Sequence, residues 1–206
     1  YNINAELIEK KITKKTKAIM CVHILGLPTD MAKIQSICQK KKLILFEDTC
    51  ESLGTTYNKK HLGTFGDYGM YSFYYSHQIT SGEGGMIVCG SEKNYNILKS
   101  LRSHGWSRDT KFHKDIVKKY KNLNENFLFI NSGFNLRPTD IQAAIGNNQL
   151  KRLNKFINIR NENREKIINC LKKSPKWNGQ FNFINSKKNI SPSWFGLAVL
   201  VNPLYR

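Results

Sequence analysis

Three short segments of the sequence combine chemically versatile side chains with turns. The first, Phe46 to Gly54, places Asp48 directly after an apolar run. A carboxylate at the end of a buried strand is costly unless it has a partner, and a protonated ring nitrogen is a suitable one. Helix capping is the alternative role, and for an isolated aspartate it is the more common one.

The second segment runs from Gly66 to Gly85 and carries hydroxyl and imidazole groups ahead of a glycine-rich turn. A strand here would deliver Ser72, Ser76 and His77 to one rim. Serine hydroxyls can bond a phosphate, and glycine lets the backbone approach a ligand closely. Taken alone, the Gly-Glu-Gly-Gly turn is a weak signal, because such turns often only close hairpins.

The third segment, Ser132 to Gly146, opens a helix. Asn135 and Arg137 precede the expected helix start, where donors can meet an anion. A capped surface helix with a solvated arginine accounts for the same pattern equally well.

Alternating helices and strands are expected to position these side chains. Helices are predicted over 4–15, 31–42, 91–103 and from Pro138 to about residue 169, and strands over 18–23, 43–46, 68–75 and 85–89. Thr29 and Asp30 can cap the second helix, whose apolar positions 31, 34, 37 and 38 have helical spacing, and Ser91 can cap the third. Residues 57–64 read as a hairpin or loop, 111–126 as a mobile loop or short surface helix, and 181–201 as broken strand. Continuously apolar strands between helices indicate an α/β fold whose mostly parallel sheet is covered by helices on both faces. Ligands bind such sheets at the carboxyl ends of strands, where Asp48 and the turn around His77 fall.

The formal charge of +18 raises the question of nucleic-acid binding. The lysines are scattered over helices and loops, and no nucleic-acid motif accompanies them. We therefore expect solvated basic faces and no nucleic-acid partner, although a basic surface would favour a doubly phosphorylated substrate.

Five widely spaced cysteines form no C-x-x-C pair, so neither a metal site nor a disulfide framework is expected. Cys21, Cys50 and Cys89 read as small buried hydrophobes, which favours a reducing, cytoplasmic compartment. No apolar run is long enough for a membrane span. The chain lacks an initial Met and ends abruptly at Arg206, so we expect a fragment of a longer protein.

Together the three segments resemble the DegT/DnrJ family of nucleotide-sugar aminotransferases, which are pyridoxal-phosphate (PLP) enzymes of the aspartate-aminotransferase fold, PLP fold type I. The resemblance runs from about Lys17 to Arg164 and includes the stretches 22–31 and 101–105. It implies a partial PLP-binding large domain over 1–150, followed over 151–206 by a long connecting helix and the start of a C-terminal small domain. It also implies that the phosphate-binding turn and a ring-stacking aromatic precede Tyr1.

The resemblance also implies roles for individual residues. Asp48 would pair with the pyridine nitrogen of PLP, Glu51 would lie near its phenolic oxygen, and Ser72 would bind its phosphate. Asn135 would reach the phosphate of the partner subunit's cofactor, which implies a homodimer with shared active sites. An opposite charge near the ring nitrogen keeps it protonated, as an electron sink requires.

Residue 77 departs from the family pattern, which has lysine where this chain has His77. Imidazole cannot form the imine that a primary amine forms with PLP. One branch of the family, the sugar 3-dehydratases acting on nucleotide-linked 4-keto-6-deoxy sugars, resembles this chain more closely because it also has histidine here. In that branch the cofactor works as free pyridoxamine phosphate (PMP), with glutamate as amino donor, and the histidine is the base that allows the C3 hydroxyl to leave.

The sequence therefore predicts a PLP/PMP-dependent 3-dehydratase of deoxysugar or cell-surface polysaccharide biosynthesis, including lipopolysaccharide O-antigen, with His77 and Asp48 as catalytic residues. Two other interpretations stay open. One is a sugar aminotransferase whose lysine has been lost or is supplied elsewhere. The other is a non-catalytic binding protein that keeps the fold.

Overall fold

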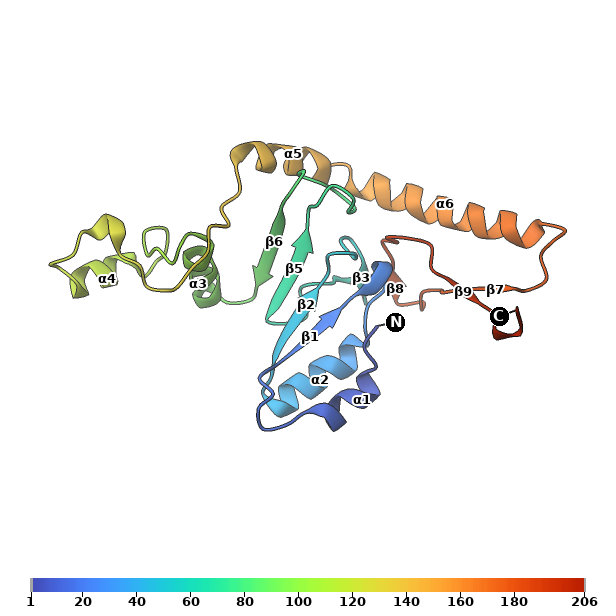
Figure 1. Ribbon diagram of the computed structural model, residues 1–206, viewed down its shortest axis with the longest axis horizontal. Helices are drawn as coiled ribbons and strands as arrows, with labels where there is room; N and C mark the ends of the chain where they lie inside the picture. The colour runs from blue at the N-terminus through green and yellow to red at the C-terminus, as the bar shows by residue number, and fades with distance from the viewer. Residues whose placement is uncertain (1, 206) are drawn as a thin grey trace.

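A four-stranded sheet is the centre of the computed structural model, which describes residues 2–205 (Figure 1). Its order is β1-β2-β5-β6, with β1 (Ala18–Val22), β2 (Ile44–Asp48), β5 (Tyr68–Ser72) and β6 (Gly85–Cys89). The first three strands are parallel, and β6 is antiparallel to β5. The predicted α/β fold with a mostly parallel sheet is confirmed.

Helices α1 (Ala5–Lys11) and α2 (Met31–Lys41) cover one face of this sheet. Asp30 caps α2 by accepting a hydrogen bond from the Lys33 amide, as the sequence predicted. The apolar positions predicted for α2 are all buried, and they pack with residues of α1, β1 and β2: Met31, Ile34, Ile37 and Cys38 with Ala5, Ile8, Ile19, Cys21 and Leu45.

The opposite face of the sheet, which we also predicted to be covered, is open in the described chain. Met20, Ile44 and Met86 are 54%, 43% and 45% exposed. Side chains alternate between the two faces of a strand, so Met20 and Ile44 point away from α1 and α2. We predicted helices on both faces of the sheet. Among residues 2–205, helices cover one of these faces.

Two predicted helices end differently in the structure. The first stops at Lys11 rather than Lys15, because Thr13 and Thr16 form a local turn in which their hydroxyls accept backbone N–H bonds. The helix predicted to run from Pro138 to about residue 169 is two helices, α5 (Asp140–Leu150) and α6 (Leu153–Lys173).

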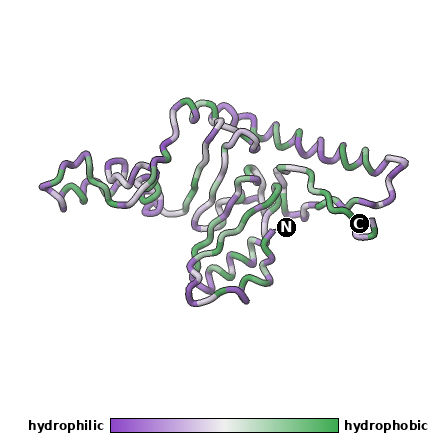
Figure 2. The backbone as a smooth tube through the Cα atoms, viewed as in Figure 1, coloured by the Kyte–Doolittle hydropathy of each residue, from purple (hydrophilic) through white to green (hydrophobic). Residues whose placement is uncertain are grey.

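The start and the interruption of that helical stretch have local causes. Thr139, not Pro138, caps α5, in a reciprocal capping box with Gln142. At the break, the Arg152 amide donates to the Gln149 carbonyl, three residues back, so the regular helical ladder is interrupted. Figure 2 shows hydrophobic and hydrophilic positions alternating along α6, as in an amphipathic helix.

The remaining elements surround the sheet. α3 (Glu92–Arg102) is capped by Ser91 as predicted, and α4 (His113–Lys119) is the short helix expected within 111–126. The expected hairpin is β3 (Thr56–Tyr57) with β4 (Lys60–His61).

The C-terminal segment forms three short strands, β7 (Phe181–Phe183), β8 (Ile190–Ser191) and β9 (Val199–Val201). Strand β7 pairs with β9, and β8 pairs with β3. The second pairing brings the C-terminal segment back to the central sheet region.

The cysteines are free thiols, of which Cys21 is fully buried while Cys50 and Cys89 are half-buried. Cys21 therefore matches its predicted role as a small core residue more closely than the other two do. Among residues 2–205, no helix has both the length and the apolar character that crossing a bilayer requires.

Candidate active site

Asp48 and Ser72 lie at the carboxyl ends of neighbouring strands and on the same, open face of the sheet. Asp48 is the last residue of β2 and is in register with Met70 of β5. Ser72 is two residues further along β5, so it returns to the same face about 7 Å beyond. The geometry therefore places a carboxylate and a hydroxyl on one face, about 7 Å apart along the strand direction, at the edge where ligands bind parallel sheets.

The Asp48 carboxylate is held by the turn that follows β2. Its Oδ1 accepts a hydrogen bond from the Cys50 amide at 3.0 Å. Burial, followed by the hydrogen bond and charge of Asp48, raises the pKa of the Cys50 thiol to about 12. Cys50 is therefore protonated at neutral pH.

His77 lies in a turn after β5, as predicted, although the strand is shorter than the predicted 68–75. The strand ends at Ser72, and the His77 amide donates to the Tyr74 carbonyl in a turn. The loop is closed at its base by hydrogen bonds from Phe73 to Gly84 and from Ser81 to Phe73. A Cβ at Gly84 would meet the Ser81 hydroxyl at 2.3 Å, so the Ser81 side chain would have to turn away from the Glu83 carbonyl to which it donates.

The imidazole of His77 has a defined hydrogen-bonding state. Its Nδ1 lies 2.5 Å from the carbonyl oxygen of Cys50, and a carbonyl can only accept, so Nδ1 carries the proton. In the neutral ring, Nε2 then has a free lone pair and can accept a proton. Cys50 follows Asp48 by two residues, so one turn positions both the Asp48 carboxylate and the His77 ring.

The other two predicted residues, Glu51 and Asn135, make no side-chain contact with Asp48, Ser72 or His77 in the hydrogen bonds of residues 2–205. The Glu51 carboxylate accepts a hydrogen bond from the Leu25 amide at 2.8 Å. Asn135 is exposed and is bridged to Ser103, just beyond α3. No hydrogen bond among residues 2–205 joins Asn135 to Asp48, Ser72 or His77.

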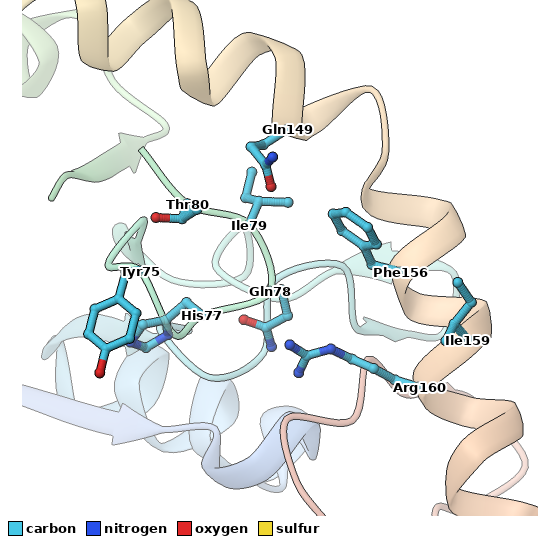
Figure 3. A pocket seen from close by; sticks show the side chains of 9 residues that line it. All are labelled: Tyr75, His77, Gln78, Ile79, Thr80, Gln149, Phe156, Ile159 and Arg160. Atoms are coloured by element: carbon cyan, nitrogen blue, oxygen red, sulfur yellow. The ribbon is translucent and has the colours of Figure 1, made fainter. Parts of the chain in front are cut away.

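A cavity of about 300 Å³ adjoins His77 (Figure 3). Its walls come from the 75–80 loop, the end of α5 and the first turns of α6: Tyr75, His77, Gln78, Ile79, Thr80, Gln149, Phe156, Ile159 and Arg160. Phe195 of the C-terminal segment stacks obliquely near His77, with ring centroids 5.2 Å apart.

Sequence reasoning missed several of these residues. Gln78, Arg160 and Phe195 come together only through tertiary packing, so no local pattern marked them. It also missed the buried pair His23 and Glu47, both fully buried and 3.2 Å apart. An acid inside the apolar run 43–48 was a visible signal, since a buried carboxylate needs partners.

Comparison with known proteins places this arrangement in a family. The model of the DegT/DnrJ/EryC1/StrS aminotransferase family matches residues 1–204. The chain belongs to this family. Among its relatives, the GDP-4-keto-6-deoxy-D-mannose 3-dehydratase of Escherichia coli O55:H7 is 38% identical over 202 residues, which are 97% of this chain and 50% of that protein.

Two further relatives are informative. The GDP-perosamine synthase of Escherichia coli O157:H7 is 37% identical over 162 residues, covering 79% of this chain and 40% of that protein. A crystal structure of GDP-4-keto-6-deoxymannose-3-dehydratase with a trapped PLP-glutamate geminal diamine superposes with a TM-score of 0.80 at 35% identity, covering 98% of this chain and 51% of that one. The chain thus spans about half the length of these relatives.

Proposed function

We propose that the full-length protein is a PLP/PMP-dependent 3-dehydratase of a nucleotide-linked 4-keto-6-deoxy sugar. Such a reaction serves deoxysugar and cell-surface polysaccharide biosynthesis, including lipopolysaccharide O-antigen. The observation that carries the proposal is His77, which occupies the family's lysine position with Nδ1 bound to the Cys50 carbonyl and Nε2 free. The similarity to 3-dehydratases along nearly the whole chain supports it.

The residues at the carboxyl ends of β2 and β5 fit the cofactor chemically. Asp48 would hold the pyridine nitrogen, because its carboxylate is anchored on one oxygen and retains acceptor capacity on the other. Ser72 would bind the cofactor phosphate, and Glu51 would lie on the phenolic side. When bound, the cofactor supplies the electron sink for chemistry at the sugar carbons.

His77 is the proposed general base. Its protonated Nδ1 is fixed by the Cys50 carbonyl, which orients the ring and leaves Nε2 to take up a proton. Imidazole cannot form the imine that lysine forms with PLP, so His77 would offer a proton acceptor at this position without binding the cofactor covalently. The relative that was trapped with a PLP-glutamate adduct supports glutamate as the amino donor.

We also propose a cytoplasmic homodimer in which Asn135 reaches the cofactor phosphate of the partner subunit. Exposed apolar side chains near Asn135 support this assembly, since large apolar patches mark protein interfaces. They are Phe127, Phe134, Leu136 and Ile141, each more than 60% exposed. Within each chain, residues 1–150 form the proposed partial large domain and 151–206 the connecting helix and start of the small domain, and the break before α6 supports this boundary.

An aminotransferase is the second candidate, favoured by the 37% identity to GDP-perosamine synthase. The product distinguishes the two. The full-length protein is incubated with cofactor, glutamate and GDP-4-keto-6-deoxymannose, and the sugar is analysed by mass spectrometry. A dehydratase gives a sugar lacking the C3 oxygen together with free ammonia, whereas an aminotransferase gives a 4-amino sugar. A non-catalytic binding protein gives neither product.

A further inference from the structure

Arg160 of α6 has unused hydrogen-bonding capacity in the cavity beside His77. Its Nη1 contacts the carbonyl oxygens of Trp194 and Phe195, each at 3.3 Å. Within residues 2–205 no carboxylate lies within ion-pair distance of its guanidinium, although the side chain is half-buried. A half-buried guanidinium retains its positive charge, and two weak carbonyl contacts leave most of its five N–H donors free.

The next arginine on the same face of α6 shows what a structural arginine looks like in this fold. Arg164 is 6% exposed and pairs with Glu165 at 2.6 Å. It also donates to the Ile184 carbonyl and the Asn185 side chain, and it stacks on Trp194. Arg160, one helical turn away, lies over the Phe195 ring with its guanidinium carbon 6.0 Å from the centroid, but among residues 2–205 its Nε and Nη2 hydrogens have no protein acceptor.

A second polar group in the cavity wall also lacks a partner. Gln78 is 3% exposed, and its Nε2 donates to the Glu51 carbonyl, but its Oε1 has no hydrogen-bond partner. Figure 3 shows the Arg160 side chain reaching from α6 toward Gln78 and the loop that carries His77. A buried amide oxygen without a protein partner can accept a hydrogen bond from an ordered water or from a ligand donor such as an ammonium group.

The remaining walls of the cavity are partly apolar, with Ile79, Phe156 and Ile159 beside the polar groups. No Asp or Glu lines it, so its formal charge comes from Arg160. A volume of about 300 Å³ lies at the lower end of small-molecule sites, which suits an amino acid better than a whole nucleotide-linked sugar.

We propose that Arg160 is a substrate-binding residue that holds a carboxylate of the amino donor next to His77. The planar guanidinium matches a carboxylate with two parallel hydrogen bonds. Ile79 and Phe156 would pack against the donor's methylene groups, and the Gln78 oxygen would face its ammonium. This inference rests on the proposed function for the identity of the ligand, but not for the existence of a carboxylate site.

Glutarate is the probe that tests it, because it has both carboxylates and no amine and so cannot react. Its binding to the full-length protein is measured by titration calorimetry for the parent, Arg160→Gln, Arg160→Lys and the control Lys155→Gln. Lys155 is exposed on the same helix, and its replacement removes the same charge. We expect Arg160→Gln to weaken glutarate binding about tenfold or more, Arg160→Lys to weaken it less, and Lys155→Gln to change it less than about twofold.

Three results overturn the proposal: no saturable glutarate binding by the parent protein, equal binding by Arg160→Gln, or an Arg160→Gln effect confined to the KM for the nucleotide sugar. The last would assign Arg160 to a phosphate instead. If Arg160→Gln fails to fold, the weaker glutarate binding expected of Arg160→Lys tests the proposal instead, because lysine keeps the positive charge but loses the paired hydrogen bonds. If glutarate binds through Arg160 but glutamate never changes the cofactor spectrum, the proposed function fails while the carboxylate site stands.

Discussion

The Asp48 carboxylate and the His77 ring are held by the same turn, so a single backbone segment sets both the proposed charge partner and the proposed base. Asp48 accepts from the Cys50 amide, and His77 donates to the Cys50 carbonyl. Because both contacts use backbone atoms, they tolerate changes in the Cys50 side chain. The positions of the two catalytic candidates therefore depend on the fold of the turn more than on their neighbours' identities.

Replacing Asp48 with Asn keeps the side chain's size and its acceptor for the Cys50 amide, but removes the negative charge. We expect the turnover rate to fall about a hundredfold or more, because the cofactor's ring nitrogen loses the charge that keeps it protonated. The measurement is the rate of C3-deoxygenated product at saturating cofactor. A rate within about threefold of the parent's would refute the role of Asp48.

At the scale of secondary-structure elements, Glu47 ties β2 to its neighbours. Its carboxylate accepts hydrogen bonds from His23 of the segment after β1, and from the amides of Gly63, Phe65 and Gly66 in the loop before β5. Burial alone raises the pKa of Glu47, but these hydrogen bonds outweigh it, and the pKa lies below its ordinary value of 4.5. The anion is thus the form that the fold stabilises.

We expect Glu47→Gln to destabilise the full-length protein by about 3 kcal/mol at neutral pH, since an amide nitrogen would face buried N–H donors. The pKa of Glu47 is lower in the folded than in the unfolded chain, so its stabilisation is complete above about pH 4.5 and is lost as the pH falls through the folded value. The difference in unfolding free energy between parent and variant should therefore shrink on acidification. Denaturant unfolding at several pH values measures it.

Glu162→Gln is the matched control for that experiment, because Glu162 is exposed and its 3.7 Å pair with Lys166 lies on the surface. It should change the unfolding free energy by less than about 1 kcal/mol at every pH. A Glu47→Gln variant that unfolds like this control would show that the buried hydrogen bonds contribute nothing.

The sequence predicted these elements well where the signal was local. The apolar spacing of α2 and the Asp30 and Ser91 caps were read correctly because each depends on neighbouring residues. The break before α6 was missed because no proline or glycine marks Lys151 and Arg152. Residues 73–75, which begin the loop that holds His77, were read as strand because Phe73, Tyr74 and Tyr75 have high strand propensity, which tertiary contacts overrode.

At the scale of the whole molecule, the proposed site draws on parts of the chain that lie far apart. Asp48, Ser72 and His77 could be identified from sequence because each sits in a recognisable segment. Arg160 and Phe195 could not, because only the packing of α6 and the C-terminal segment against the 75–80 loop brings them there. Asn135 is bridged to Ser103, just beyond α3, and its proposed role at the partner subunit's cofactor depends on a homodimer.

A shared site predicts complementation between two inactive variants. His77→Asn and Asn135→Ala, each inactive alone, are unfolded and refolded together in equal amounts. In a mixed dimer one site carries both changes and the other carries neither, so random pairing should restore about a quarter of the parent's activity. Refolding each variant alone is the control. Mixed dimers that stay inactive would contradict the sharing of Asn135 between subunits.

The central claim is that His77 leaves the cofactor without a covalent bond to the protein. Reduction with borohydride followed by mass spectrometry of the PLP-loaded, full-length protein tests it most directly. His77→Lys is the positive control, since its primary amine should capture PLP and yield the 72–85 peptide with a reduced cofactor attached. We expect the parent protein's 72–85 peptide to stay unmodified while PLP remains bound before reduction. A reduced cofactor on any lysine of the parent protein would contradict it.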